Sequence, residues 1–208
     1  MNRRRRLITA VTPSRELPRG YTKLNYLESQ KSSETSYINI PVYPQSNSTY
    51  RIKTTAQNMG ASGAGYSGWN YGGIFGWRSN NRWEDGASTA PSSLSSLNKT
   101  EVDLIIRTSN NTTSVTYKNI QGEDTLSRSN NVLNKCSNTP YPIFALRDNN
   151  YFEGQSKFRI YGGFQIYKDN VLIVNLITAL DPNHRPCMYD TISQRTYYSA
   201  TREEFLYG

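Results

Sequence analysis

The residue types best suited to ligand chemistry gather in a Gly-, Ser- and Trp-rich stretch near the middle of the chain. The candidates are three aromatic side chains and one carboxylate, namely Trp69, Tyr71, Trp83 and Asp85. Aromatic rings stack on the C–H faces of sugars, and the asparagine and aspartate side chains placed between them can hold sugar hydroxyls. This pattern therefore predicts a loop cluster that contacts a glycan or a partner.

Two other interpretations of these aromatic residues stay open. Large aromatic residues in β domains most often pack in the interior, and Trp77, beside Ile74 and Phe75, fits that role. Trp69 and Tyr71 would then cover one edge of the packed layers. Protein–protein interfaces are also enriched in Trp, Tyr and Arg, so the same residues would suit contact with another protein.

The chain shows no arrangement of side chains that a hydrolase would need. Glycosidases require two carboxylates that flank one bond, whereas the adjacent acids Glu84 and Asp85 would point to opposite faces of a strand. We interpret that pair as part of a turn. The single histidine, His184, stands in a proline-bounded loop without the spacing of a metal site or a catalytic triad. We therefore predict a protein that is not an enzyme and that has no metal and no cofactor.

The two cysteines, Cys136 and Cys187, both lie in loop-like sequence. Two cysteines allow one disulfide but do not require it. We expect buried or idle thiols, and the disulfide remains the alternative.

Basic residues are concentrated at the N-terminus. Residues 1–23 hold seven of the 24 basic residues and one of the 16 acidic residues, which leaves the rest of the chain close to neutral. The anchoring candidates are consecutive in the sequence, namely Arg3, Arg4, Arg5, Arg6, Leu7 and Ile8. Such a segment suits a flexible arm that becomes ordered on an acidic partner protein or a neighbouring subunit. Nucleic acid is the less favoured partner, because the arm lacks the interleaved aromatic residues of a single-strand groove.

The elements that would position these residues are β-strands. Segments rich in β-branched and aromatic residues recur between turns of Gly, Asn, Asp and Ser. They cover 21–28, 36–40, 49–55, 74–77, 102–108, 113–119, 141–146, 157–167 and 171–177. No helical period is sustained over three turns, and only Thr201–Phe205 would form a short helical turn. The pattern predicts an all-β sandwich or jelly roll.

Length and composition favour one domain without a membrane segment. The chain has 208 residues, of which 36% are hydrophobic and 12% aromatic. One sandwich of this size commonly forms a single core. No apolar run approaches the roughly 20 residues needed to cross a membrane, so we expect no membrane contact.

The C-terminal residues carry a hairpin pattern. Met188 and Tyr189 lead into a turn, a return run follows at 196–198, and the chain closes on Phe205–Tyr207. Period-two aromatic patterning broken by polar turns is a hairpin signal, so we expect the C-terminal residues to lie in a sheet.

Several blocks carry a family resemblance, and they are listed here in chain order as Leu17–Ser29, Thr35–Asn39, Ile74–Arg78, Phe158–Tyr167 and Asp181–Asp190 with the hairpin that follows. Together they resemble the concanavalin A-like (LamG-like) jelly-roll domains of phages and prophages of gut bacteria. Asn25 departs from the glutamate usual in that family, and most of the region 61–98 matches no block.

The resemblance implies two curved antiparallel sheets whose first and last strands are neighbours. It divides the chain into a basic N-terminal anchoring arm, residues 1–16, and a jelly-roll domain, residues 17–208. It further implies a virion structural protein on the surface of the phage particle, such as a head fibre or capsid decoration. A homo-oligomer, for example a trimer, would bind other capsid or tail proteins through the arm. The alternative is a lectin-like module for host adhesion that binds surface glycans, on a phage tail or a bacterial surface.

Overall fold

The structure, a computed structural model, describes residues 16–30, 36–59, 66–69, 72–75, 99–109, 112–119, 122–129, 133, 136–147, 149, 152–153 and 158–208. These residues form an all-β protein, which confirms the predicted fold class. The described part of the chain contains no helix long and apolar enough to cross a membrane.

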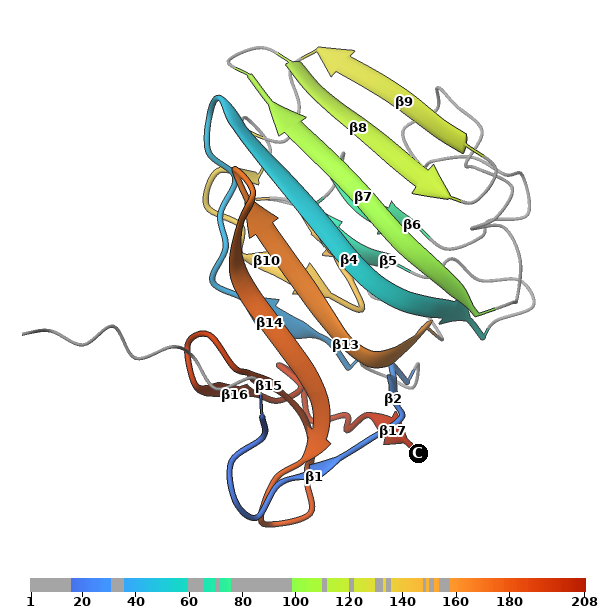
Figure 1. Cartoon of the computed structure of the whole chain (residues 1–208), viewed down its shortest axis with the longest axis vertical. Helices are drawn as coiled ribbons and strands as arrows, with labels where there is room; N and C mark the ends of the chain where they lie inside the picture. Colours follow the sequence, from blue (N-terminus) through green and yellow to red (C-terminus); the bar gives the residue numbers. More distant parts are fainter. Residues whose placement is uncertain are drawn as a thin grey trace, which may run out of the picture.

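The largest element is an antiparallel sheet of 11 strands (Figure 1). Its main path runs, in spatial order, through β16 (Arg195–Tyr197), β15 (Pro186–Asp190), β14 (Val171–Leu180), β13 (Phe158–Lys168), β4 (Ser48–Asn58), β7 (Thr100–Thr108), β8 (Thr112–Asn119) and β9 (Gly122–Ser129). Three short strands pair off this path, namely β1 (Thr22–Lys23) with β14, β2 (Tyr26–Glu28) with β13, and β17 (Leu206–Tyr207) with β2. The sheet is not closed, since β9 and β16 stand at opposite ends of the path.

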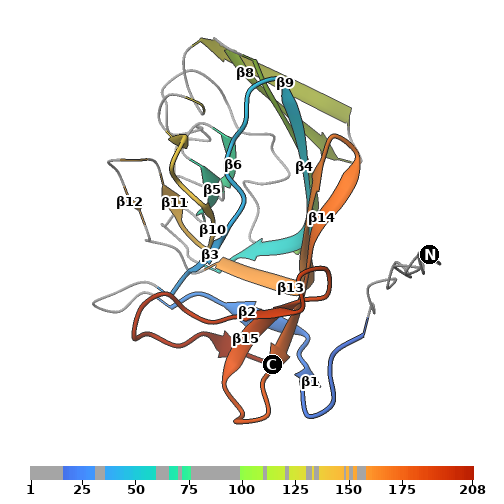
Figure 2. The same cartoon turned by 90° about the vertical axis from the view of Figure 1, so that its left-hand side faces the viewer.

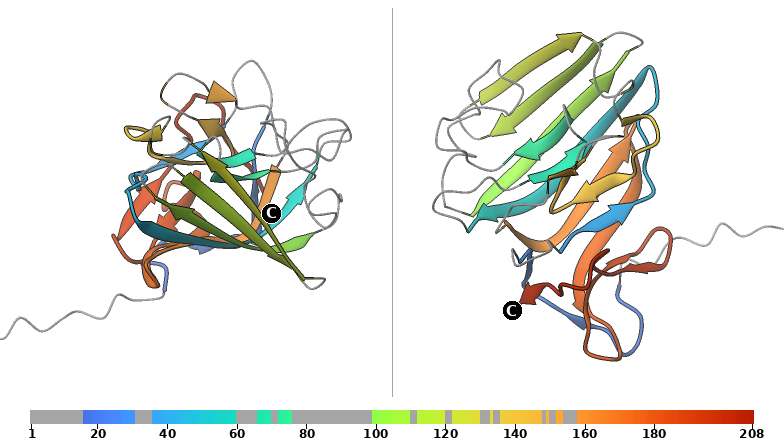
Figure 3. Two further views of the ribbon diagram at one scale, coloured as in Figure 1. Left: turned by 90° about the horizontal axis from the view of Figure 1, so that it is seen from above. Right: turned by 180° about the vertical axis from the view of Figure 1, so that it is seen from behind.

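Two small sheets lie against one face of the large sheet (Figures 2 and 3). One pairs β10 (Tyr141–Ile143) with β3 (Ile38–Ile40). The other runs β12 (Phe152–Glu153), β11 (Leu146–Arg147), β5 (Tyr66–Trp69) and β6 (Gly72–Phe75), and its β11–β5 pairing is parallel. The fold is therefore β-sandwich-like. It differs from the prediction of two antiparallel sheets, because the described second layer consists of two separate sheets and includes a parallel pair.

Aromatic side chains from both layers pack in a continuous chain between them. Tyr50 of β4 contacts Trp69 of β5 with ring centroids 5.2 Å apart, and Trp69 contacts Tyr141 of β10 at 5.1 Å. Tyr141 in turn meets Phe164 of β13 at 5.9 Å. All four side chains are fully buried. Burial of this ring area, together with edge-to-face contacts, joins the large sheet to the two small ones.

Strand β13 shows how the two faces of the large sheet differ. Ile160, Phe164 and Ile166 are fully buried and face the small sheets, while Tyr161 and Gln165 between them are partly exposed. Successive side chains of a strand point to opposite faces, so the buried set defines the inner face and the others define the outer face. Figure 1 looks onto the outer face.

Two neighbouring pairs of predicted strands, 157–167 with 171–177 and 102–108 with 113–119, form antiparallel hairpins. The turn between β13 and β14 contains Asp169 and Asn170 with φ of 50° and 67°, the positive values that a tight hairpin turn requires. The turn that follows Thr108 joins β7 to β8 in one antiparallel hairpin.

The predicted strand 21–28 is broken into β1 and β2, and this is a correction. Leu24 lies between them and is buried, with its N–H donating to the carbonyl of Thr178 at 2.9 Å. Thr178 Oγ1 donates back to the carbonyl of Leu24 at 2.8 Å. This exchange with β14 satisfies the buried backbone groups at the break. Residues 201–205 are also not helical and form a bend followed by extended chain.

The C-terminal residues lie in the sheet, as predicted. Strands β15 and β16 form the hairpin, with Tyr189 opposite Thr196. In β17, Leu206 pairs with Glu28 of β2. The carbonyl of Gly208 also accepts hydrogen bonds from the N–H groups of Asn25 and Tyr26, at 2.7 and 3.0 Å. The last strand, β17, therefore lies beside β2, the second part of the predicted strand 21–28.

Candidate functional site

The predicted anchoring residues, Arg3, Arg4, Arg5, Arg6, Leu7 and Ile8, lie outside the described part of the chain. Their role stays a prediction. The structure does describe how the domain begins: the hydroxyl of Tyr21 is 2.6 Å from Thr196 Oγ1, and its ring lies 5.3 Å from that of Tyr189. Strand β1 then pairs Thr22 with Leu180. The start of the domain is thus fastened to its C-terminal strands.

A buried carboxylate organises the loop beside this junction. Asp181 Oδ1 accepts the N–H groups of Asn183 and Arg185 at 2.9 and 2.8 Å. Asp181 Oδ2 accepts the hydroxyl of Tyr198 at 2.7 Å. Burial alone would raise the pKa of Asp181, but these hydrogen bonds and the nearby Arg185 guanidinium stabilise the carboxylate and hold its pKa below the usual value. Asp181 therefore serves the structure of this loop.

Trp69 does not offer its ring to a ligand, which corrects its place in the predicted contact cluster. Its side chain is fully buried, and the indole N–H donates to the carbonyl of Thr139 at 3.0 Å. Contacts with Tyr50 and Tyr141 cover it from both layers, as the packing interpretation expected. The other members of the predicted cluster, Tyr71, Trp83 and Asp85, lie outside the described residues.

The cysteines are buried as expected, although Cys187 lies in strand β15 and not in a loop. Cys136 and Cys187 are free and buried, so the structure contains the idle thiols and not the disulfide. Burial, with a smaller effect from Asp181, raises the pKa of Cys187 to about 12, which keeps this thiol protonated at neutral pH. His184 is exposed in the loop before β15. Among the described residues no group of His, Cys, Asp and Glu could hold a metal ion.

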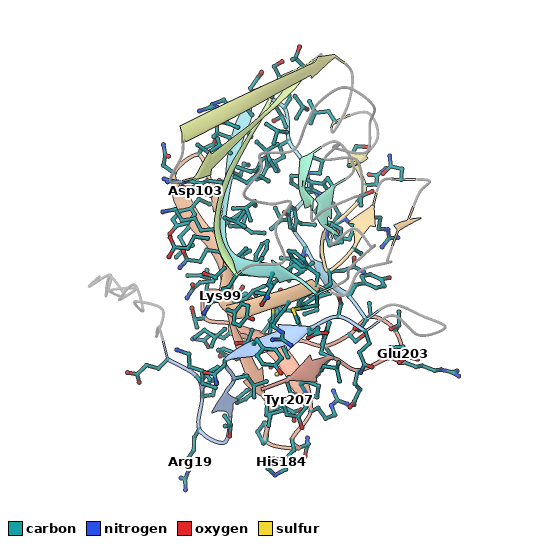
Figure 4. The ribbon with its side chains drawn as sticks, turned by 90° about the vertical axis from the view of Figure 1, so that its right-hand side faces the viewer. Arg19, Lys99, Asp103, His184, Glu203 and Tyr207 are labelled. Carbon is teal, nitrogen blue, oxygen red and sulfur yellow. The ribbon has the colours of Figure 1, made fainter. Side chains whose placement is uncertain are left out.

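A hollow of about 740 Å³ opens on the outer face of the large sheet, over β4, β7, β13 and β14. Its lining includes Lys53, Glu101, Asp103, Tyr161, Gln165 and Asn175. Figure 4 shows Asp103 on the large-sheet side of the molecule, and Arg19 and His184 at the lower end. The hollow and the start of the domain are therefore separate regions.

Two consecutive glycines in β13 create the hollow. Tyr161 pairs with Thr55 of β4, and Phe164 pairs with the next β4 residue, Thr54, so Gly162 and Gly163 form a bulge. Gly162 has a φ of 71°, and a Cβ placed on it would meet nothing within 4 Å. A Cβ on Gly163 would lie 2.2 Å from the carbonyl oxygen of Leu176. The outer side-chain layer is interrupted because neither position carries a side chain.

A row of hydrogen-bonded polar side chains borders the hollow across β13 and β14. Gln165 Oε1 accepts the hydroxyl of Tyr167 at 3.2 Å, and Gln165 Nε2 donates to Asn175 Oδ1 at 3.0 Å. Asn175 Nδ2 then donates to Thr191 Oγ1 at 2.7 Å. Both amides are thereby held in one orientation.

The aromatic wall of the hollow is also fixed in place. The hydroxyl of Tyr161 donates to Gln57 Oε1 at 2.5 Å and accepts from Arg159 Nη1 at 3.3 Å. Arg159 itself pairs with the largely buried carboxylate of Glu28 through Nε and Nη2, at 3.0 and 2.6 Å. Lys99 Nζ lies 4.3 Å from the centre of the Tyr161 ring. The wall is held by several independent contacts.

Charges of both signs surround the hollow. The guanidinium of Arg51 donates to both carboxylate oxygens of Asp103, at 2.7 and 2.5 Å. Lys53 and Glu101, of opposite sign, also line the hollow. This composition suits the binding of a polar ligand of low net charge.

Sequence reasoning treated the stretch 157–167 as an ordinary strand and missed this hollow. The Gly162–Gly163 pair was the available signal, because glycine inside a strand pattern indicates a bulge or a close backbone approach. No family model, curated protein or solved structure matches this chain.

Proposed function

We propose that this chain is a non-enzymatic structural protein of a bacteriophage virion, with a concanavalin-like (LamG-like) jelly roll displayed on the capsid surface as a head fibre or decoration. In this proposal the basic arm, residues 1–16, anchors the domain to other virion proteins. The observation that carries the proposal is the pairing of β17 with β2, which is the second part of the predicted first strand 21–28, since the family resemblance implies that the first and last strands are neighbours.

The arrangement of the domain supports a display role. Residues 16–23 enter at the lower end in Figures 1 and 4, whereas the hollow lies over the large sheet above them. An arm attached at that end would leave the outer face of the sheet accessible. The charge distribution agrees, because the positive charge is concentrated before residue 24 and the domain is nearly neutral.

Exposed apolar side chains at the same end support contact with a partner. Leu206 and Tyr207, which are consecutive on β17, are 47% and 46% exposed. Figure 4 places Tyr207 toward the lower end, with Arg19 and His184. A second copy of the chain or a capsid protein would bury these side chains in the proposed homo-oligomer.

Deleting residues 2–16 tests the anchoring role. We expect the truncated protein to fold and to disappear from purified particles, because the basic segment supplies the attachment. A variant with lysine at positions 3–6 retains the charge and should be incorporated, which separates charge from length. Incorporation of the truncated protein at the level of the wild type would contradict the proposal.

The second candidate is a glycan-binding module for host adhesion, on a phage tail or a bacterial surface. The polar hollow on the outer face favours it, because balanced charge and oriented amides suit a neutral polar ligand. The predicted contacts Tyr71, Trp83 and Asp85 remain part of this candidate. The alanine variants Tyr71→Ala and Trp83→Ala should lose binding on a glycan array if that cluster contributes.

A further inference from the structure

We infer that the hollow over the Gly162–Gly163 bulge is a binding site for a short, uncharged oligosaccharide. The inference rests on the second candidate function and names its site and ligand class, while it is independent of the virion role. Trp69, the member of the predicted Trp-rich cluster that the structure describes, does not line this hollow.

The floor of the hollow allows a ligand to approach the backbone. Gly163 has no room for a Cβ, since the Leu176 carbonyl oxygen would lie 2.2 Å away, so the local packing requires glycine there. Gly162 is different, because a Cβ on it would meet nothing within 4 Å. The space above Gly162 is therefore unfilled, and the positive φ of 71° is what disfavours a side chain there.

The polar groups at the rim are oriented before any ligand arrives. The bonds from Tyr167 to Gln165 and from Gln165 to Asn175 fix both amide planes. A primary amide carries two N–H donors and two oxygen lone pairs, so each amide has hydrogen-bonding capacity beyond the bonds within this row. Preorganised groups lose little conformational entropy on binding, which favours a ligand rich in hydroxyl groups.

The charges at the rim select against a charged ligand. Arg51 neutralises Asp103 through two hydrogen bonds, and Lys53 and Glu101, of opposite sign, line the hollow from neighbouring strands. An acidic sugar would meet two carboxylates, and a cationic ligand would meet Lys53 and Arg51. The volume of about 740 Å³ falls within the range of small-molecule sites, roughly 300–1,000 Å³. A neutral oligosaccharide satisfies both the charge and the size.

The substitution Gly162→Asn provides a direct test. Asparagine tolerates positive φ better than other side chains, so this variant should fold and place an amide in the hollow. A matched control is Gly20→Asn, which makes the same exchange at a positive-φ glycine that does not line the hollow and follows Arg19, labelled at the lower end in Figure 4. Gln165→Leu removes one rim amide, and Gln45→Leu removes an exposed amide that does not line the hollow.

The probes are an array of neutral hexose and N-acetylhexosamine oligosaccharides beside sialylated and uronate-containing ones, followed by titration of the best neutral probe with the ¹⁵N-labelled protein. We expect the wild type to bind neutral probes, with chemical-shift changes at the amide groups of residues in the hollow. Gly162→Asn and Gln165→Leu should each lose at least about tenfold in affinity, and the two control variants should lose none. Thermal unfolding of each variant verifies that it is folded.

Three outcomes would overturn the inference. Binding to acidic probes alone would contradict the ligand class. Unchanged affinity in folded Gly162→Asn, with loss in Tyr71→Ala or Trp83→Ala, would move the site to the Trp-rich cluster and leave the glycan-binding function in place. Binding to no probe at millimolar concentration would remove both the hollow and the second candidate function, and the particle-incorporation experiment would be unaffected.

Discussion

The inner and outer faces of β13 are built from different interactions on one backbone. On the inner face Phe164 is fully buried and joins the chain of aromatic rings that connects the layers. On the outer face the neighbouring Gln165 is partly exposed and belongs to a row of hydrogen bonds beside an open hollow. The inner face stabilises the fold through burial, whereas the outer face offers polar groups to solvent or a ligand. Substitutions on the two faces should therefore affect different properties.

The largest expected effect is on the inner face. Trp69→Ala should lower the free energy of unfolding by about 3–5 kcal/mol, because it leaves a cavity between the layers. Tyr43→Ala, at a side chain that is 45% exposed, should change it by no more than about 0.5 kcal/mol. Urea denaturation followed by circular dichroism measures both. Equal losses in the two variants would show that Trp69 is not a central packing residue.

Substitutions in the Gly162–Gly163 bulge should have a smaller effect on stability, and the size of that effect should depend on which glycine is replaced. Gly163→Ala should cost about 3 kcal/mol, because the added Cβ would collide with the Leu176 carbonyl and the backbone would have to move. Gly162→Ala should cost only about 1 kcal/mol, the strain of a positive φ, because its Cβ enters open space. The same denaturation experiment compares the two. A reversed order would contradict the described geometry of the bulge.

Asp181 lies away from both faces of β13. Its replacement by asparagine should lower the free energy of unfolding by about 2 kcal/mol at neutral pH, since the N–H groups of Asn183 and Arg185 lose a charged acceptor. Its folded pKa lies below the unfolded value of about 4, so its contribution is fully present above that pH and is lost as pH falls through the folded pKa. The stability difference between wild type and Asp181→Asn, measured from pH 7 to 2, should shrink at the acidic end. A constant difference would exclude this titration.

The smallest effect on stability should come from the outer face. Gln165→Leu should change the free energy of unfolding by no more than about 0.5 kcal/mol, because its amide is partly exposed. The same variant is expected to lose ligand binding. A large loss of stability would mean that the polar row is a structural element of the sheet, and the contrast between the two faces would fail.

The strands that could be predicted from the sequence are those with strong local patterns. The alternation in 157–167, the apolar run in 171–177 and the Asp169–Asn170 turn each contain their own signal. Strand β9 was missed because Leu126 is its sole apolar residue, so its formation depends on pairing with β8. Local sequence does not encode such pairing.

The candidate site was less predictable for a related reason. Trp69 has the same local surroundings whether it is buried or exposed, and its burial depends on Tyr50 and Tyr141, which are distant in the sequence. The polar row likewise joins Gln165 to Asn175 and Thr191 across separate strands. The Gly162–Gly163 pair was the one local sequence feature that indicated the hollow. Recognising it as a bulge requires the register of β13 against β4, which the local sequence does not contain.

The position of β13 in the large sheet has a consequence for biosynthesis. Phe158 pairs with Asn58, and Leu206 pairs with Glu28. Strands β4 and β2 can therefore pair with β13 and β17 only after at least 100 further residues have been translated. While the ribosome is still producing the second half, β2 and β4 lack the neighbour that separates them in the finished sheet. The large sheet can be completed only after β13 and β17 have been translated, and its folding should be slow, on the millisecond-to-second scale typical of β proteins with distant contacts. Until then the nascent chain exposes unpaired strands, a period in which chaperones would protect it from aggregation.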